Sequence, residues 1–233
     1  LLTRFRTPRT ALETVTGAGV GLAAVLVPTL LRDSPGSGAV LVGGAVQLAV
    51  LFMAGNSFGT DGPPLTHEIL AGADAETMAR GKARSIVIVA APLAVLGPLL
   101  AAVITNEWRY LVAGFGVGIG GLLAGTGAAV VQSALVPIAI PESDNPFAGG
   151  ESGKGMVAAL LLGVVLAGLA IVTIPVALAL FWATDRGRVG LVTLFGALTI
   201  IVGWGVMRFG IRIATKRLRG SDPEFIVSVT PAR

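Results

Sequence analysis

The chain has 233 residues, of which 54% are hydrophobic and only 13% are charged, and its mean hydropathy is +0.84. Soluble domains carry about a quarter charged residues, so this composition excludes a water-soluble globular domain and predicts an all-α integral membrane protein. We interpret the formal net charge of +4 as topology signals and contacts with lipid headgroups, with no nucleic-acid partner. The absence of Cys and the single His exclude disulfides, thiolate sites and a His-pair metal site.

Six apolar stretches of the length needed to cross a bilayer follow one another along the chain. They cover residues 12–31, 38–55, 85–105, 110–138, 157–182 and 190–211. We therefore predict one six-helix transmembrane domain over residues 1–233. Because the chain opens at Leu1 rather than Met, we also expect it to be a fragment, such as the second half of a longer polypeptide.

Basic residues are unevenly divided between the two sides of this predicted domain, and cytoplasmic loops are enriched in Lys and Arg. The richer side carries Arg4, Arg6, Arg9, Arg80, Lys82, Arg84, Lys154, Arg208, Arg212, Lys216, Arg217, Arg219 and Arg233, and the other carries Arg32, Arg109, Arg186 and Arg188. This places both termini, the loops 56–84 and 139–156, and the basic tail 212–233 in the cytoplasm. The Arg-, Ala- and Gly-rich composition suggests a bacterial inner (plasma) membrane.

The first cytoplasmic loop has the pattern of a short surface helix followed by a second helix. Pro64 suits a first helical turn, and Gly72 would end that helix. An apolar face at helical spacing is formed by Leu65, Ile69 and Leu70. Asp74 is then a candidate N-cap for a second helix, which leads through Arg80, Lys82 and Arg84 into the third span.

Two glycine-rich stretches superficially resemble nucleotide-binding loops. Residues 116–121 lie inside an apolar span rather than after a strand, and residues 150–155 lack the first Gly and the Ser or Thr that a phosphate loop requires. We predict instead that the fourth span packs closely on another helix through small residues. The residues concerned are Gly114, Gly118, Gly121 and Gly125.

The predicted spans contain almost no ionisable residues in their interiors, which argues against an ion-coupled carrier with a buried charge relay. The main polar groups at membrane depth are Gln47, Gln132, Ser133 and Thr173. His67, beside Glu68, has too few potential partners for a metal site and is interpreted as loop surface. We predict no catalytic, cofactor-binding or metal-binding residues, and hence not an enzyme.

The first cytoplasmic loop resembles that of ABC-2-type exporter permeases, in which a similar stretch joins the second and third spans. The matching residues are Asn56, Phe58, Gly59, Asp61, Gly62, Gly81 and Lys82. A weaker likeness to the second cytoplasmic loop of those permeases is found at Asn145, Pro146 and Phe147, and the opening residues 6–13 are similar to the start of their first span.

This resemblance implies a subunit that forms a pathway together with a second six-helix half, either separate or fused. ATPase subunits, expected as a dimer, would bind ATP and Mg²⁺ and dock on a coupling helix at Pro64, Leu65, Ile69 and Leu70. The expected cargo is a hydrophobic or amphipathic compound, such as a drug, an antibiotic or a lipid-like molecule. A secondary transporter and a non-transporting membrane scaffold are the alternatives.

Overall fold

The computed structural model describes residues 8–30, 39–61, 65, 67–69, 71–139 and 152–219, which form helices and their connections without any strand. In chain order the elements are α2 (Pro8–Leu30), the 3-10 helix η1 (Ala39–Ala45), α3 (Val46–Ala54), α5 (Ala75–Thr105), the 3-10 helix η2 (Trp108–Tyr110), α6 (Leu111–Leu135), α7 (Ser152–Asp185) and α8 (Val189–Arg219). The all-helical class predicted from composition is confirmed for these residues.

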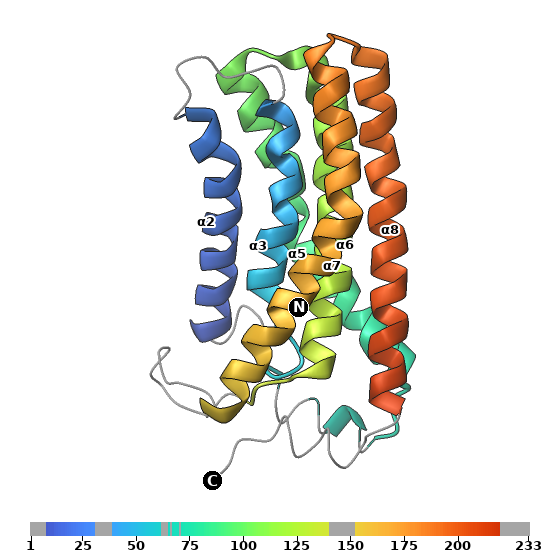
Figure 1. The fold of residues 1–233 in the computed structure, drawn as a ribbon. Coiled ribbons are helices and arrows are strands. Elements are labelled where there is room, and N and C mark those ends of the chain that lie inside the picture. Colours follow the sequence, from blue (N-terminus) through green and yellow to red (C-terminus); the bar gives the residue numbers. More distant parts are fainter. Residues whose placement is uncertain are drawn as a thin grey trace.

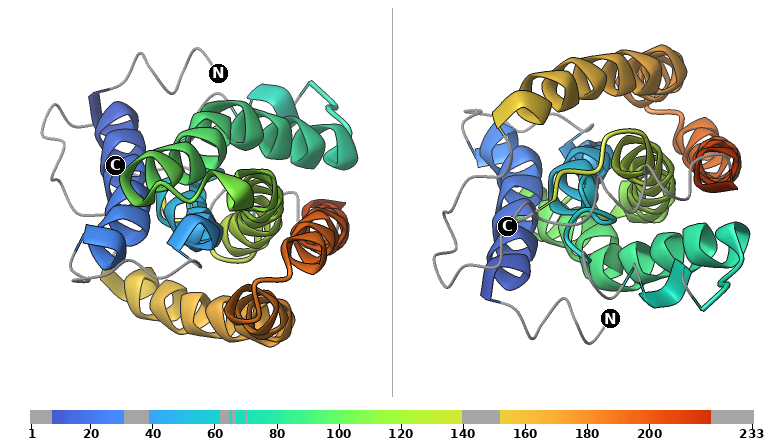
Figure 2. Two further views of the ribbon diagram at one scale, coloured as in Figure 1. Left: turned by 90° about the horizontal axis from the view of Figure 1, so that it is seen from above. Right: turned by 90° about the horizontal axis from the view of Figure 1, so that it is seen from below.

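The helices form an upright bundle in which α5, α6, α7 and α8 run alternately in opposite directions (Figure 1). Figure 2 looks along the bundle and shows α3 and α6 inside a ring made by α2, α5, α8 and α7. In the most apolar stretch of α6, 78% of the residues are buried, against 6% in α7. The core of the bundle therefore lies around α6, and α7 is the least buried of the four long apolar helices α5 to α8.

Within the described residues, four helical segments are each long and apolar enough to cross a membrane. They are Ala75–Thr105, Trp108–Leu135, Gly155–Asp185 and Val189–Arg219, and they indicate a membrane-embedded protein. The first two predicted spans are also helical, but the apolar helices described there, Thr14–Ala23 and Ala39–Ala54, are shorter. Crossing of the membrane by α2 and by η1 with α3 stays a prediction.

The predicted N-cap at Asp74 is confirmed. Its carboxylate oxygen Oδ2 accepts hydrogen bonds from the backbone N–H groups of Glu76 and Thr77, at 3.0 and 3.1 Å. From this cap α5 continues unbroken for 31 residues, about 46 Å at the usual helical rise. The helix that begins at this cap therefore leads without a break into the third span, as predicted, and starts ten residues before the span boundary predicted at 85. Gly72, with φ of +77°, ends the preceding turn of helix as the sequence predicts.

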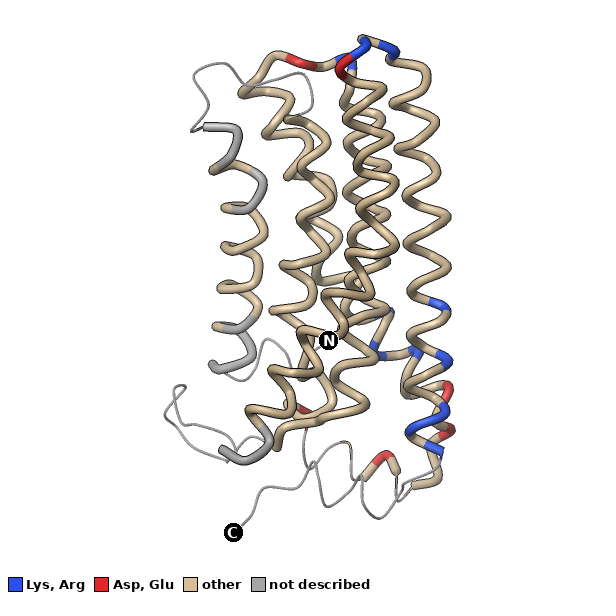
Figure 3. The backbone as a smooth tube through the Cα atoms, viewed as in Figure 1, with Lys and Arg blue, Asp and Glu red and all other residues tan. Residues whose placement is uncertain are grey.

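Figure 3 shows the described charged residues gathered toward the two ends of the bundle, with a long uncharged stretch between them. One end, formed by the start of α5 and the end of α8, carries Arg80, Lys82, Arg84, Arg208, Arg212, Lys216, Arg217 and Arg219. The opposite end carries Arg109, Arg186 and Arg188. Charged residues at the ends and an uncharged stretch between them are what a hydrocarbon layer about 30 Å thick requires.

Candidate functional site

The residues after α3 form a compact junction with the end of α6. The Asn56 side chain makes two hydrogen bonds with the backbone of Ile138: Nδ2 donates to the carbonyl oxygen at 3.0 Å, and Oδ1 accepts from the N–H at 2.9 Å. The N–H of Phe58 donates to Oγ of Ser133 at 2.6 Å, and the hydroxyls of Ser57 and Ser133 lie 3.4 Å apart. Residues about 80 positions apart in sequence are thereby joined at one end of the bundle.

Lys82 joins α5 to the same junction. Its Nζ donates to the carbonyl oxygen of Ser57 at 2.8 Å, forms an ion pair with Asp61 and lies 5.5 Å from the centre of the Phe58 ring. The Lys82 side chain is only 12% exposed, so its charge is held largely within protein and compensated there. We name the set Asn56, Phe58, Asp61, Lys82 and Ser133 the loop junction.

Gly59 has a steric role in the loop junction. A Cβ atom at this position would lie 2.3 Å from both the Ile138 carbonyl oxygen and Oδ1 of Asn56, so only glycine fits. Gly81, in contrast, has open space where a Cβ would be, and Gly62 lies outside the described residues. Most of the motif that carries the resemblance is thus engaged in holding three segments of the chain together.

The structure describes the predicted coupling helix only in part. It contradicts the prediction that Leu65 lies on a face that docks on a partner. Leu65 is 1% exposed and belongs to the hydrophobic core together with Phe58, so its side chain is covered by this chain and is not free to enter a groove on a partner. Ile69 is half-buried against the same core. Pro64 and Leu70, and the second-loop residues Asn145, Pro146 and Phe147, lie outside the described residues.

The four glycines predicted to pack closely on the fourth span lie against neighbouring helices. A Cβ atom added at Gly114 would lie 2.7 Å from Cγ1 of Val40, and one added at Gly118 would lie 2.4 Å from the Ala94 carbonyl oxygen. A Cβ atom added at Gly121 would lie 2.9 Å from the Gly44 oxygen, and one added at Gly125 would lie 2.7 Å from the Gln47 oxygen. This face of α6 packs on η1, α3 and α5, and small residues allow the approach.

A second glycine face on α6, which the sequence reasoning missed, packs on α8. A Cβ on Gly203 would lie 2.2 Å from the Gly120 oxygen, and one on Gly116 would lie 2.4 Å from the Gly196 oxygen. The hydroxyl of Thr199 also donates to the Gly116 oxygen at 2.8 Å. The sequence signal was present, because α8 has glycines at intervals of seven: Gly196, Gly203 and Gly210.

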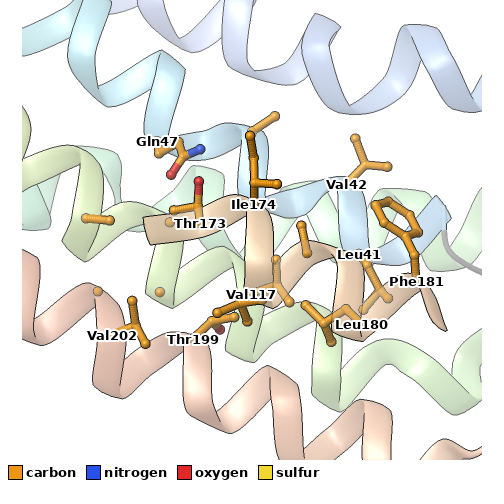
Figure 4. A pocket seen from close by; sticks show the side chains of 18 residues that line it. Leu41, Val42, Gln47, Val117, Thr173, Ile174, Leu180, Phe181, Thr199 and Val202 are labelled. Carbon is orange, nitrogen blue, oxygen red and sulfur yellow. The ribbon is translucent and has the colours of Figure 1, made fainter. Parts of the chain in front are cut away.

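An apolar cavity of about 360 Å³ lies between η1 with α3, α6, α7 and α8. Figure 4 shows its lining, which is aliphatic apart from Phe181 and the polar side chains of Gln47, Thr173 and Thr199. Thr173 and Thr199 already donate to backbone oxygens of their own or a neighbouring helix. No ionisable residue is among the described residues that line the cavity, so it suits an uncharged, largely apolar group.

Comparisons with protein-family models, curated proteins and solved structures found no match. The likeness to ABC-2-type permeases therefore rests on the loop residues themselves.

Proposed function

We propose that the chain is a transmembrane permease subunit of an ATP-driven exporter that moves a hydrophobic or amphipathic compound across a bacterial plasma membrane. In this proposal all six apolar segments cross the membrane and both termini are cytoplasmic. Separate ATPase subunits bind ATP and Mg²⁺, and a second six-helix half completes the pathway.

The observation that carries this proposal is the apolar cavity. It lies between helices of a bundle whose four longest helices are suited to a membrane, and its three polar side chains are uncharged. Ligand sites of this kind are largely apolar with a few oriented polar groups. A carrier driven by an ion gradient needs ionisable or ion-coordinating groups near its substrate, and the described lining offers no ionisable side chain.

The loop junction supports a role in coupling. It fixes the ends of α3 and α6 and the start of α5 to one another through polar contacts, so a force applied to the loop is passed to helices that line or support the cavity. Because Leu65 is buried, we place the contact with the ATPase on the exposed side of this segment, around His67 and Glu68, rather than on Leu65.

The proposal is tested by filling the cavity. The chain is purified with its ATPase, identified by mass spectrometry, and hydrolysis is measured with and without hydrophobic compounds. Ala177 lines the cavity, so Ala177→Trp should abolish stimulation by such compounds while ATPase binding and basal hydrolysis persist. Ala159→Trp, on an exposed position of the same helix, is the matched control and should retain stimulation.

Two results would count against the proposal. Purification without any ATPase would remove the exporter assignment and favour the scaffold alternative. Equal stimulation in the Ala177→Trp and Ala159→Trp proteins would mean that the cavity does not receive the transported compound.

A further inference from the structure

A second, larger cleft opens between α5 and α8 at the basic end of the bundle, with a volume of about 870 Å³. Six cationic side chains line it: Arg80, Arg84, Arg208, Arg212, Lys216 and Arg219. Among the described residues that line it, Glu76 is the one carboxylate. The cleft therefore has a large excess of positive charge, contributed by two helices that face each other.

Most of this charge is not neutralised by the described part of the protein. The Glu76 carboxylate forms an ion pair with Arg80, and the Arg219 guanidinium lies 3.8 Å from the Glu76 carboxylate and 3.7 Å from that of Asp74. No described carboxylate lies within ion-pair distance of Arg84, Arg212 or Lys216. Like charges brought together on one surface repel, so this arrangement is stabilised when an anion is bound among them.

The floor of the cleft is apolar and lies deeper along the helices than the cations. It includes Val87, Ile88, Trp204 and Met207. A helix needs about 20 residues to cross the hydrocarbon layer, so a crossing that starts at Val189 ends near Arg208. Counting the same number of residues back from Thr105 places the other end of the α5 crossing near Ile86. The floor thus lies at the edge of the acyl chains, and the cations lie at the depth of the phosphate groups.

We propose that this α5–α8 cleft binds one anionic phospholipid. Arg84, Arg212 and Lys216 contact its phosphate, and an acyl chain lies over Trp204 and Ile88. Free phosphate would use the cations and leave the apolar floor uncovered, and a soluble acidic peptide would not reach acyl depth. A phospholipid matches both parts, and this inference stands whether or not the chain transports anything.

Trp204 provides a direct reporter, because it lines the cleft and is 50% exposed. The full chain with Trp108→Phe and Trp182→Phe retains Trp204 as its single tryptophan. It is reconstituted in vesicles of zwitterionic phosphatidylcholine with increasing brominated phosphatidylglycerol, and quenching of Trp204 is measured. Quenching by the brominated anionic lipid should saturate at a low fraction and exceed that by brominated phosphatidylcholine.

Charge removal then separates specific from general binding. Juxtamembrane cations contribute about fivefold each to anionic-lipid affinity. The double variant Arg212→Gln with Lys216→Gln should therefore lower the affinity for phosphatidylglycerol, measured by quenching of Trp204, about 25-fold. Arg186→Gln with Arg188→Gln removes the same charge at the opposite end of the bundle and should leave it unchanged. If the first double variant does not fold, the protein with the unmodified cleft is measured in 0.1 M and 1 M salt. The Debye length falls from about 10 to about 3 Å over this range, so the affinity for phosphatidylglycerol should fall.

Three outcomes would overturn the proposal: equal quenching by the two brominated lipids, no response to either the double variant or salt, or displacement of the brominated lipid by millimolar inorganic phosphate. The last would identify free phosphate as the ligand. Saturable, charge-dependent quenching that resists inorganic phosphate would establish the phospholipid site.

Discussion

The contact between α6 and α8 allows a sharp test of the fold by the substitution Gly203→Ala. The added methyl group would lie 2.2 Å from the Gly120 oxygen and 3.0 Å from the Gly120 Cα. Ordinary contacts at a Cβ begin near 3.4 Å, and neither neighbour is a movable side chain. The two helix backbones must therefore separate locally by about 1 Å.

This separation has two costs. Overpacking in a well-packed interior destabilises by about 1–3 kcal/mol. The hydrogen bond from Thr199 to the Gly116 oxygen, now 2.8 Å, would lengthen beyond a useful distance, and interhelical hydrogen bonds in membranes contribute on average about 0.6 kcal/mol. We expect Gly203→Ala to lower the free energy of unfolding by about 2–4 kcal/mol.

The assay is reversible unfolding in mixed micelles of mild detergent and dodecyl sulfate, followed by circular dichroism. Gly205→Ala is the matched control, because it lies two residues away on the same helix and a Cβ there meets no atom within 4 Å. It should change the free energy of unfolding by less than about 0.5 kcal/mol. If the two variants are equally stable, the close contact of α6 with α8 does not exist in the form described.

Three further predictions concern the ends of the bundle. Asn56→Ala should lower stability by about 1–3 kcal/mol in the same unfolding assay, because both Ile138 backbone groups lose their partner; an unchanged value would contradict the loop junction. The N–H groups of the first turn of α5, that of Thr77 foremost, lower the pKa of Asp74. The cap therefore stabilises the protein above the ordinary pKa of an aspartate and weakens as pH falls through the lowered value, and Asp74→Asn should remove this acid sensitivity from unfolding curves. For topology, a cysteine replacing Asn106 should react with an impermeant reagent in intact cells and one replacing His67 should not; the reverse pattern would invert the proposed orientation.

The local features of this protein followed from the sequence because they depend on neighbouring residues. Apolar length predicted the long helices, and the Asp74 cap and the Gly72 helix end were read from short patterns that the structure bears out. The helix that Asp74 caps runs without a break into the third span, as the pattern predicts, whereas apolar length marks only the membrane-crossing part, from residue 85 onward.

The contacts between distant segments depended on tertiary structure. Asn56 and Lys82 match a family motif, but that match does not predict the hydrogen bonds that Asn56 makes with Ile138 and Lys82 makes with Ser57. Leu65 was expected on an exposed face, since an apolar stripe on a short helix does not reveal what covers it, and the fold covers it with this chain's own core.

The sequence by itself determined that this is a helical membrane protein, where its long helices lie, and one of the two glycine faces by which α6 packs on its neighbours. Only the tertiary structure decided which helices approach: α6 uses one glycine face for η1, α3 and α5 and the other for α8. The physical reason is that lipid and neighbouring helices are equally apolar surroundings. Hydrophobicity therefore marks a membrane helix without distinguishing its lipid-facing side from its packed side, and the cavity and the basic cleft arise only from how the helices are finally arranged.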